Sequence, residues 1–300
     1  LSLKKENFYM VENTVDGKFF VTARGWEDLS EILKSYEELQ VEIGEELIGE
    51  FLQKEEIARD FAGYYRLYEK YKSDYQIQEI LDGNVTSRQL KTCCDMGKKA
   101  SFEERFTVTE MLLEAVTERI SSFQKTDEKT EKLYGNLKLL KVFLQEKNSV
   151  EAMEQFIVSR RKALDAKICS ELLTAEEAAR EEEQIRILEE YFFQLKELHI
   201  SDVAEGIEQI GERFGNVCRL RNEKLEETKK MLEQAFSFLE ECFGEGQELL
   251  LFETGLTGED RCSIFISQYG CPSYFKHCEL LLYSKKENEL RKECSDLLED

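Results

Sequence analysis

The feature that most constrains the fold is the scarcity of proline, which occurs once in 300 residues. Proline ends or kinks a helix, so a chain that nearly lacks it can form helices that continue for many turns. Charged residues make up 35% of the sequence and apolar residues 41%, a balance typical of long helices with one solvated and one buried face. We therefore expect an all-α fold with real hydrophobic cores.

The net charge of −22 restricts the classes of partner. An acidic chain repels nucleic acid phosphates and anionic membrane surfaces, and no basic stripe with interleaved aromatic residues reverses that charge. We expect neither nucleic acid nor a membrane as a partner. The longest apolar runs resemble "ELLLF", and the nine cysteines, an odd number, suggest free thiols in a reducing compartment. These features predict a cytoplasmic protein without a signal peptide, and the start at Leu1 suggests a part of a longer one.

A short β-hairpin is expected at the start of the chain. Two strand-like runs in residues 8–21 flank Asp16-Gly17, a pair that favours tight hairpin turns. Helices follow after Thr22, and Gly83-Asn84 and the pair Ser101 and Glu104 give end and start signals within them. The predicted ranges are 23–39, 44–53, 54–82, 86–96 and 101–124.

A domain boundary is expected in the polar stretch "QKTDEKTEK", residues 124–132. It separates a helical subdomain with the hairpin over 1–125 from a helical extension over 126–300. Apolar residues in the extension keep mostly the three-four spacing of coiled coils, so we expect a long antiparallel bundle, with Thr174 and Glu177 as a capping box. The predicted helices are 130–146, 149–172, 174–198 and 202–243, with shorter ones over 247–299.

Arg24 lies in the first turn of the first long helix, where a cation meets the positive end of the helix dipole at a cost of about 0.3–1 kcal/mol. If Thr22 caps that helix, free backbone N–H groups and a guanidinium gather at one end, which suits an anion. A charge-assisted hydrogen bond to phosphate contributes about 1.5–3 kcal/mol and outweighs the dipole. The alternative is an exposed ion pair between Arg24 and Asp28, one turn further along.

At these residues the chain resembles a known family. The run Thr22-Ala23-Arg24-Gly25-Trp26-Glu27 is similar to the second-sensor segment of MoxR-type AAA+ ATPases, where Thr-Pro-Arg-(Ser/Thr)-Trp-Glu opens the helical lid. The resemblance implies that 1–125 is the lid, that Arg24 contacts the terminal phosphate of ATP beside the cap Thr22, and that Trp26 anchors the lid helix. Ala23 and Gly25 depart from the family pattern and reduce the rigidity of the first turn.

Two further segments, "EIARDFAGYYRLYEKYKSDYQIQEIL" and "FISQYGCPSYFKHCELLLY", resemble the C-terminal helical region of a Firmicutes-like MoxR subgroup. The resemblance implies a chaperone-like ATPase that, as a full-length protein, uses ATP and Mg and assembles as a ring. The implied partners of the chain are its own AAA+ core, neighbouring ring subunits and a von Willebrand factor A domain protein. A stand-alone helical scaffold that never meets nucleotide is the alternative.

No complete ATPase site is visible in the sequence. A P-loop needs G-x-x-x-x-G-K-[ST], and Gly97-Lys98-Lys99 lacks both the earlier glycine and the hydroxyl residue. No run of four apolar residues precedes Asp-Glu, as magnesium binding and water activation require. We therefore assign no catalytic residue to this chain, and His199 has no plausible nucleophile partner.

Three other patterns favour structural roles. Aromatic residues at three-four spacing on 54–82 predict a core stripe, or alternatively a partner interface; they are Phe61, Tyr64, Tyr68, Tyr71 and Tyr75. Cys262, Cys271, His277 and Cys278 resemble a metal cluster, but their spacing matches no zinc motif, so we expect buried small hydrophobes and no metal site. The run Glu181-Glu182-Glu183 is typical of a solvated helix face.

Overall fold

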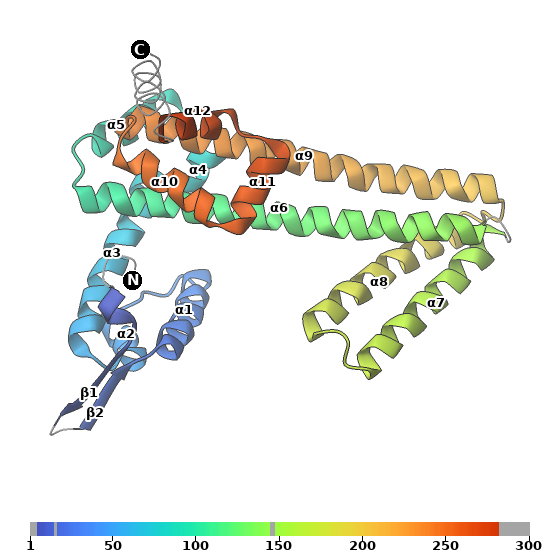
Figure 1. Cartoon of the computed structure of the whole chain (residues 1–300), viewed down its shortest axis with the longest axis horizontal. Coiled ribbons are helices and arrows are strands. Elements are labelled where there is room, and N and C mark those ends of the chain that lie inside the picture. Colours follow the sequence, from blue (N-terminus) through green and yellow to red (C-terminus); the bar gives the residue numbers. More distant parts are fainter. Residues whose placement is uncertain (1–4, 15–16, 145–147, 282–300) are drawn as a thin grey trace, which may run out of the picture. The chain divides into compact units, whose positions relative to one another are not determined.

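The structure, a computed structural model, describes residues 5–14, 17–144 and 148–281 (Figure 1). Contacts group the chain into two compact units. The first unit consists of Leu1–Ile77 and Arg88–Met111, and the second unit consists of Gln78–Ser87 and Leu112–Asp300. Helices dominate both, as predicted. Within the described ranges, no helix combines the length and the apolar character needed to cross a membrane.

The expected hairpin opens the first unit. After a short 3-10 helix at Lys5–Phe8, β1 (Met10–Thr14) pairs antiparallel with β2 (Gly17–Val21). The antiparallel pairing confirms the predicted hairpin, while residues 15–16 between the strands, Asp16 among them, lie outside the described residues. Val21, at the end of β2, is fully buried, so it ties the hairpin to the helices that follow.

Three helices of the first unit share a core with the hairpin. They are α1 at Ala23–Glu38, α2 at Glu45–Phe51 and α3 at Glu55–Tyr75, and α5 follows at Ser87–Gly97. Apolar residues at three-four spacing bring α1, α2 and α3 together, because burying such a stripe removes it from water. The buried members are Val21, Leu29, Leu33, Ile48, Leu52, Ile57, Ala58 and Ala62.

The single helix predicted over 54–82 is wrong, because the chain turns at Gln76. This residue has a left-handed φ of 51°, and it separates α3 from the short helix α4 at Ile77–Asp82. Tyr75 and Ile77, on either side of the break, are both buried in the core. The left-handed conformation therefore accompanies tertiary packing, and no glycine or proline in the sequence signals it. The predicted end at Gly83-Asn84 is confirmed, since both N–H groups bond to carbonyls of α4.

The second unit contains the long helices. The bounds are α6 at Phe102–Leu144, which begins in the first unit, α7 at Ser149–Cys169, α8 at Ala175–Glu197, α9 at Val203–Phe243, α10 at Gln247–Gly258, α11 at Asp260–Tyr269 and α12 at Pro272–Leu281. These positions confirm the predicted helices from 149 to 243 to within about three residues. The predicted short helices are present up to 281, and 282–299 lie outside the described residues. The capping box of Thr174 and Glu177 is also confirmed.

The helix break predicted at 124–132 is wrong, because α6 runs through these residues without interruption. Some of their polar side chains contact other helices of the second unit. Asp127 accepts a hydrogen bond from Arg221 of α9 at 2.7 Å, and Lys129 pairs with Glu183 of α8 at 2.7 Å. The compact units divide after Ile77, after Ser87 and after Met111. The predicted division into the domains 1–125 and 126–300 stays a prediction.

Helices α7 and α8 form an antiparallel pair that packs against α9 and the end of α6. Figure 1 shows α9 alongside the second-unit part of α6, and the bond between Asp127 and Arg221 joins the two helices. The shared core is apolar throughout. It includes Leu133, Leu140, Met153, Phe156, Leu188, Tyr191 and Ile210.

A close contact fixes α7 against the start of α9. Ser149 is fully buried; its hydroxyl donates to the carbonyl oxygen of Ile200 at 2.8 Å, and its N–H donates to that of Ser201 at 3.2 Å. A Cβ atom on Gly206 would lie 2.5 Å from the Cβ of Ser149. Glycine at 206 therefore permits the approach of the two helices.

We expect Gly206→Ala to lower the free energy of unfolding by about 1–3 kcal/mol, because neither backbone can give way without moving a helix. Gly211→Ala on the same helix is the control. No described atom lies within 4 Å of its added Cβ, so the higher helix propensity of alanine should raise the free energy of unfolding by about 0.5–1 kcal/mol. Urea unfolding followed by circular dichroism measures both, and equal effects would contradict the close contact.

Candidate functional site

The start of α1 has the cap that its sequence predicts. Thr22 is extended, with φ −131° and ψ 158°, and its side chain accepts a hydrogen bond from the backbone N–H of Gly25 at 3.1 Å. The first turn of α1 holds no acidic residue. The positive end of this helix dipole is therefore not neutralised by a carboxylate of its own first turn.

Arg24 takes the exposed ion pair that was the alternative to an anion. Its side chain is 81% exposed, and its Nε lies 3.3 Å from Oδ1 and 3.4 Å from Oδ2 of Asp28. Exposed pairs at this spacing contribute only about 0.3–0.5 kcal/mol, because both charges are already well hydrated. The ion pair keeps Arg24 near the start of the helix, but it is weak enough for Arg24 to leave Asp28 for another anion.

The packing of α1 against α2 requires a glycine at position 25, which the sequence alone did not reveal. A Cβ atom at this position would lie 2.8 Å from the carbonyl oxygen of Phe51, the last residue of α2. Backbone atoms cannot swing aside as a flexible side chain can. The departure from the family's hydroxyl residue therefore lets α1 approach the end of α2, in addition to loosening the first turn.

Trp26 links three parts of the first unit. Its ring meets the ring of Phe61 edge to face, with centroids 5.1 Å apart and an interplanar angle of 78°. Its indole N–H donates to the backbone oxygen of Asn7 at 3.1 Å. The side chain is partly buried against the core of the unit, so Trp26 anchors α1 as expected.

The aromatic stripe of α3 divides into a buried and an exposed part. Tyr71 and Tyr75 are buried, and the hydroxyl of Tyr75 donates to Glu104 at 3.0 Å. Tyr64 remains 37% exposed near the other end. Tyr65, outside the predicted stripe, donates to Glu37 at 2.9 Å, and its burial and this bond raise the pKa of the phenol. The stripe is core at its C-terminal end, while the predicted interface role stays open at its start.

The residues of the metal-like cluster have separate partners. Cys262 contacts the hydroxyl of Thr117 at 3.5 Å, Cys271 contacts Glu233, and His277 contacts Glu240. The side chain of Cys278 lies outside the described residues. Among the side chains that the structure describes, no group of three metal-ligating residues converges.

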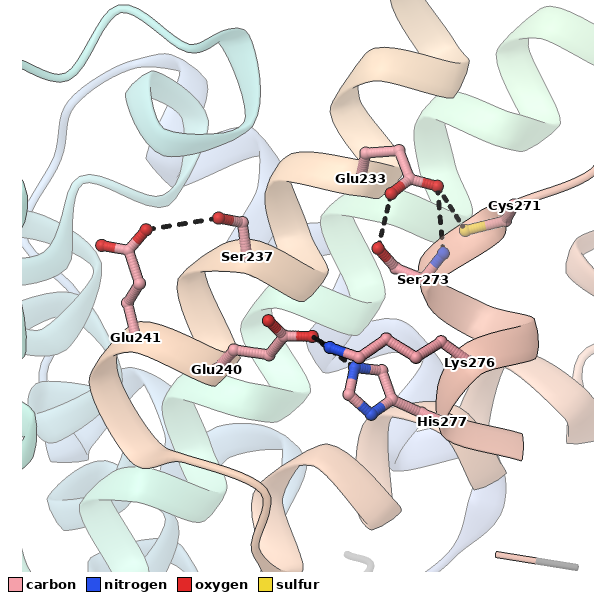
Figure 2. A network of polar contacts seen from close by, with 8 residues as sticks. All are labelled: Glu233, Ser237, Glu240, Glu241, Cys271, Ser273, Lys276 and His277. Carbon is pink, nitrogen blue, oxygen red and sulfur yellow. Dashed lines mark hydrogen bonds and ion pairs between the residues drawn. The ribbon is translucent and has the colours of Figure 1, made fainter. Parts of the chain in front are cut away.

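Figure 2 shows the contacts that hold the start of α12 to α9. Glu233 of α9 accepts hydrogen bonds from the hydroxyl of Ser273 at 2.5 Å, the N–H of Ser273 at 3.4 Å and the thiol of Cys271 at 3.2 Å. Burial, with a contribution from Glu233, raises the pKa of Cys271 to about 12. Cys271 is therefore a neutral hydrogen-bond donor and not a nucleophile.

A second carboxylate of α9, Glu240, lies two turns further along the same face. It pairs with Lys276 at 3.1 Å and contacts the ring nitrogen Nε2 of His277. Burial alone would raise the pKa of Glu240, but the bonds from His277 and Lys276 lower it below its usual value. Nearby on α10, Glu253 is 1% exposed, and burial raises its pKa to about 6.

Sequence reasoning missed these three glutamates. Glu253 offered one signal, because it lies among Leu249, Phe252 and Leu256, on the apolar face of α10 where a carboxylate is unexpected. Glu233 and Glu240 gave none, since both belong to a helix rich in acidic residues. Their role depends on α12, which comes from a distant part of the chain.

Two substitutions toward the family pattern should act in opposite directions. Ala23→Pro is expected to raise the free energy of unfolding by about 0.4–1 kcal/mol, because residue 23 is the first helical position and Thr22 before it is already extended. Gly25→Ser is expected to lower it by about 1–3 kcal/mol through the contact with Phe51. Thermal unfolding followed by the fluorescence of Trp26, the single tryptophan, reports on this unit. A stabilising Gly25→Ser would contradict the packing role of Gly25.

No protein-family model, curated protein or solved structure matches the chain. Function is therefore inferred from the residues described above and from the resemblance of residues 22–27.

Proposed function

We propose that this chain is the lid and helical extension of a MoxR-type AAA+ ATPase, a chaperone-like protein that uses ATP to remodel partners. The observation that carries the proposal is the start of α1, where the Thr22 cap, backbone N–H groups and the exposed guanidinium of Arg24 come together. Such an end suits an anion with several acceptor oxygens, as the terminal phosphate of ATP has.

The ion pair with Asp28 does not prevent this role. Leaving Asp28 costs Arg24 about 0.3–0.5 kcal/mol, whereas a charge-assisted hydrogen bond to phosphate contributes about 1.5–3 kcal/mol. In this proposal, Arg24 pairs with Asp28 when nucleotide is absent and with the terminal phosphate when ATP is bound. ATP and Mg would be held mainly by the protein's own AAA+ core and the neighbouring ring subunit, with Arg24 reporting the terminal phosphate to the lid.

Arg24→Ala in the full-length ATPase should lower ATP turnover by about tenfold to a hundredfold, the loss that corresponds to one charge-assisted hydrogen bond. The free energy of unfolding should change by less than about 0.5 kcal/mol, because the side chain is exposed. Asp28→Asn is the matched control: it breaks the same ion pair but leaves Arg24 free, so turnover should be kept. Steady-state ATP hydrolysis and thermal unfolding are the two measurements.

A stand-alone helical scaffold is the second candidate, and the Arg24–Asp28 pair favours it, since an ordinary surface pair needs no nucleotide. The two candidates differ in the gene. A P-loop encoded in frame upstream supports the ATPase, and an in-frame stop codon immediately upstream supports the scaffold. Unchanged turnover in Arg24→Ala would leave Arg24 as an ordinary surface ion pair and remove its role in sensing phosphate.

The helices after residue 125 are proposed to dock the partner, which the family resemblance suggests is a von Willebrand factor A domain protein. A groove of about 640 Å³ lies between α8 and α9 of the second unit. Phe193, which lines the groove, is 60% exposed. Glu197 and Glu212 also line the groove, together with Glu190, which pairs with Arg213 at 3.1 Å. An apolar ring among carboxylates fits a partner surface with basic side chains, whose alkyl stems cover the ring while their charges meet the acids.

We expect Phe193→Ser to reduce recovery of the von Willebrand-type partner in pull-downs with the full-length protein, and recovery by the wild type to fall as salt is raised. Leu220→Ser on α9 is the matched control, since Leu220 is also 60% exposed but does not line the groove. Point substitutions suit this test better than a deletion from residue 126, which would cut α6. Equal recovery by both variants would place docking elsewhere on the protein.

A further inference from the structure

Helix α12 contacts α9 through two ionisable side chains. Its residues Lys276 and His277 meet Glu240 of α9, one carboxylate that serves both (Figure 2). The ring of His277 stacks on Phe236 of α9, with centroids 5.9 Å apart and an interplanar angle of 11°. His277 is 1% exposed, so an ionisable ring is buried in the core at the joint where α12 meets α9.

A third helix adds a carboxyl group to this joint. Glu253 of α10 is also 1% exposed, and it interacts electrostatically with His277. Within the described part of the chain, Oε1 of Glu253 and Nδ1 of His277 are buried without a hydrogen-bond partner. Buried polar atoms of this kind are rare, because each loses its bonds to water and gains none. Two of them on facing helices point to a site where a proton matters.

We propose that Glu240, His277 and Glu253 form a proton-operated joint that holds α12 against α9 and α10 more tightly in mildly acidic than in neutral solution. The groups that face it are Glu240 and Phe236 from α9, Glu253 from α10, and Lys276 beside His277 on α12. The joint is independent of the proposed lid function, since every member belongs to the second unit.

The direction follows from the burial of Glu253. Its carboxyl group is held away from water, which disfavours the charged form and raises its pKa from 4.5 to about 6. The folded joint therefore binds this proton more tightly than the unfolded chain does. Its stabilising effect is full below about pH 4.5 and is lost as the pH rises through about 6, where an uncompensated carboxylate remains in the core.

Glu240 limits the effect on the acid side. Its pKa is lowered because the bonds from His277 and Lys276 outweigh its burial, so its contribution is present above the ordinary carboxyl range and is lost as the pH falls through the lowered value. The two glutamates have opposite dependences. The joint should therefore be tightest between about pH 4.5 and 6.

Hydrogen exchange of the whole chain at pH 5.5 and 7.5, corrected for the intrinsic exchange rate, tests the proposal. In the wild type, α12 should be several-fold, up to about tenfold, better protected at pH 5.5, with α7 of the same unit as an internal reference. Glu253→Gln, which mimics the protonated carboxyl group, should protect α12 alike at both pH values. Glu241→Gln, an exposed neighbour on α9, should keep the wild-type dependence.

Two outcomes would overturn the proposal. One is equal protection of α12 at both pH values in the wild type, and the other is an unchanged pH dependence in Glu253→Gln. If Glu253→Gln does not fold, the carboxyl carbon of Glu253 can be titrated by nuclear magnetic resonance in the wild type. A midpoint near pH 6 supports the joint, and a midpoint below pH 5 rejects it.

Discussion

The second unit depends most on the ion pair between Arg221 of α9 and Asp127 of α6. The guanidinium donates through Nε to Asp127 at 2.7 Å and through Nη2 to the hydroxyl of Tyr269 at 2.7 Å, and this hydroxyl donates to Asp127 at 2.9 Å. The same guanidinium lies 5.3 Å from the ring of Phe123. Three helices, α6, α9 and α11, thus share one closed set of bonds, and removing either Arg221 or Asp127 would leave a partly buried charge without its partner.

This pair fixes the register of two long helices that apolar packing alone would leave free to slide. In the same register, Tyr134 of α6 stacks on Phe214 of α9 with centroids 5.9 Å apart. Further along α9, Phe236 meets Phe252 of α10 edge to face. Dispersion and burial supply most of the stability of such a bundle, whereas the polar bonds select one arrangement among several of similar packing.

Local signals in the sequence were sufficient for most helices of this chain. The capping boxes, apolar spacing and hairpin pair act within a few residues, so α7, α8, α9 and the hairpin could be predicted from them. The continuity of α6 could not be predicted, because its polar stretch resembles a linker when taken alone. The partners of that stretch, Arg221 and Glu183, belong to helices that are distant in sequence. The break at Gln76 could not be predicted either, because it accompanies core packing and not a local glycine or proline. The need for glycine at 25 comes from Phe51, which is distant in sequence.

The candidate site shows the same division. The Thr22 cap and the Arg24–Asp28 pair depend on residues within one helical turn, so both were foreseeable. The run Glu181-Glu182-Glu183, interpreted as a solvated face, has two members in ion pairs with other helices, Lys167 at 2.7 Å and Lys129 at 2.7 Å. These pairs are partly exposed, so they favour a register more than they stabilise the fold.

The three glutamates around α12 show how compensation decides what a buried acid does. Glu233 receives three hydrogen bonds, and Glu240 receives a lysine and a histidine, whose bonds lower its pKa despite its burial. Glu253 accepts no hydrogen bond from the described residues at its buried Oε1, and burial raises its pKa to about 6. The response of the joint to protons is therefore concentrated in a single side chain, because its neighbours have already been compensated by donors on α12.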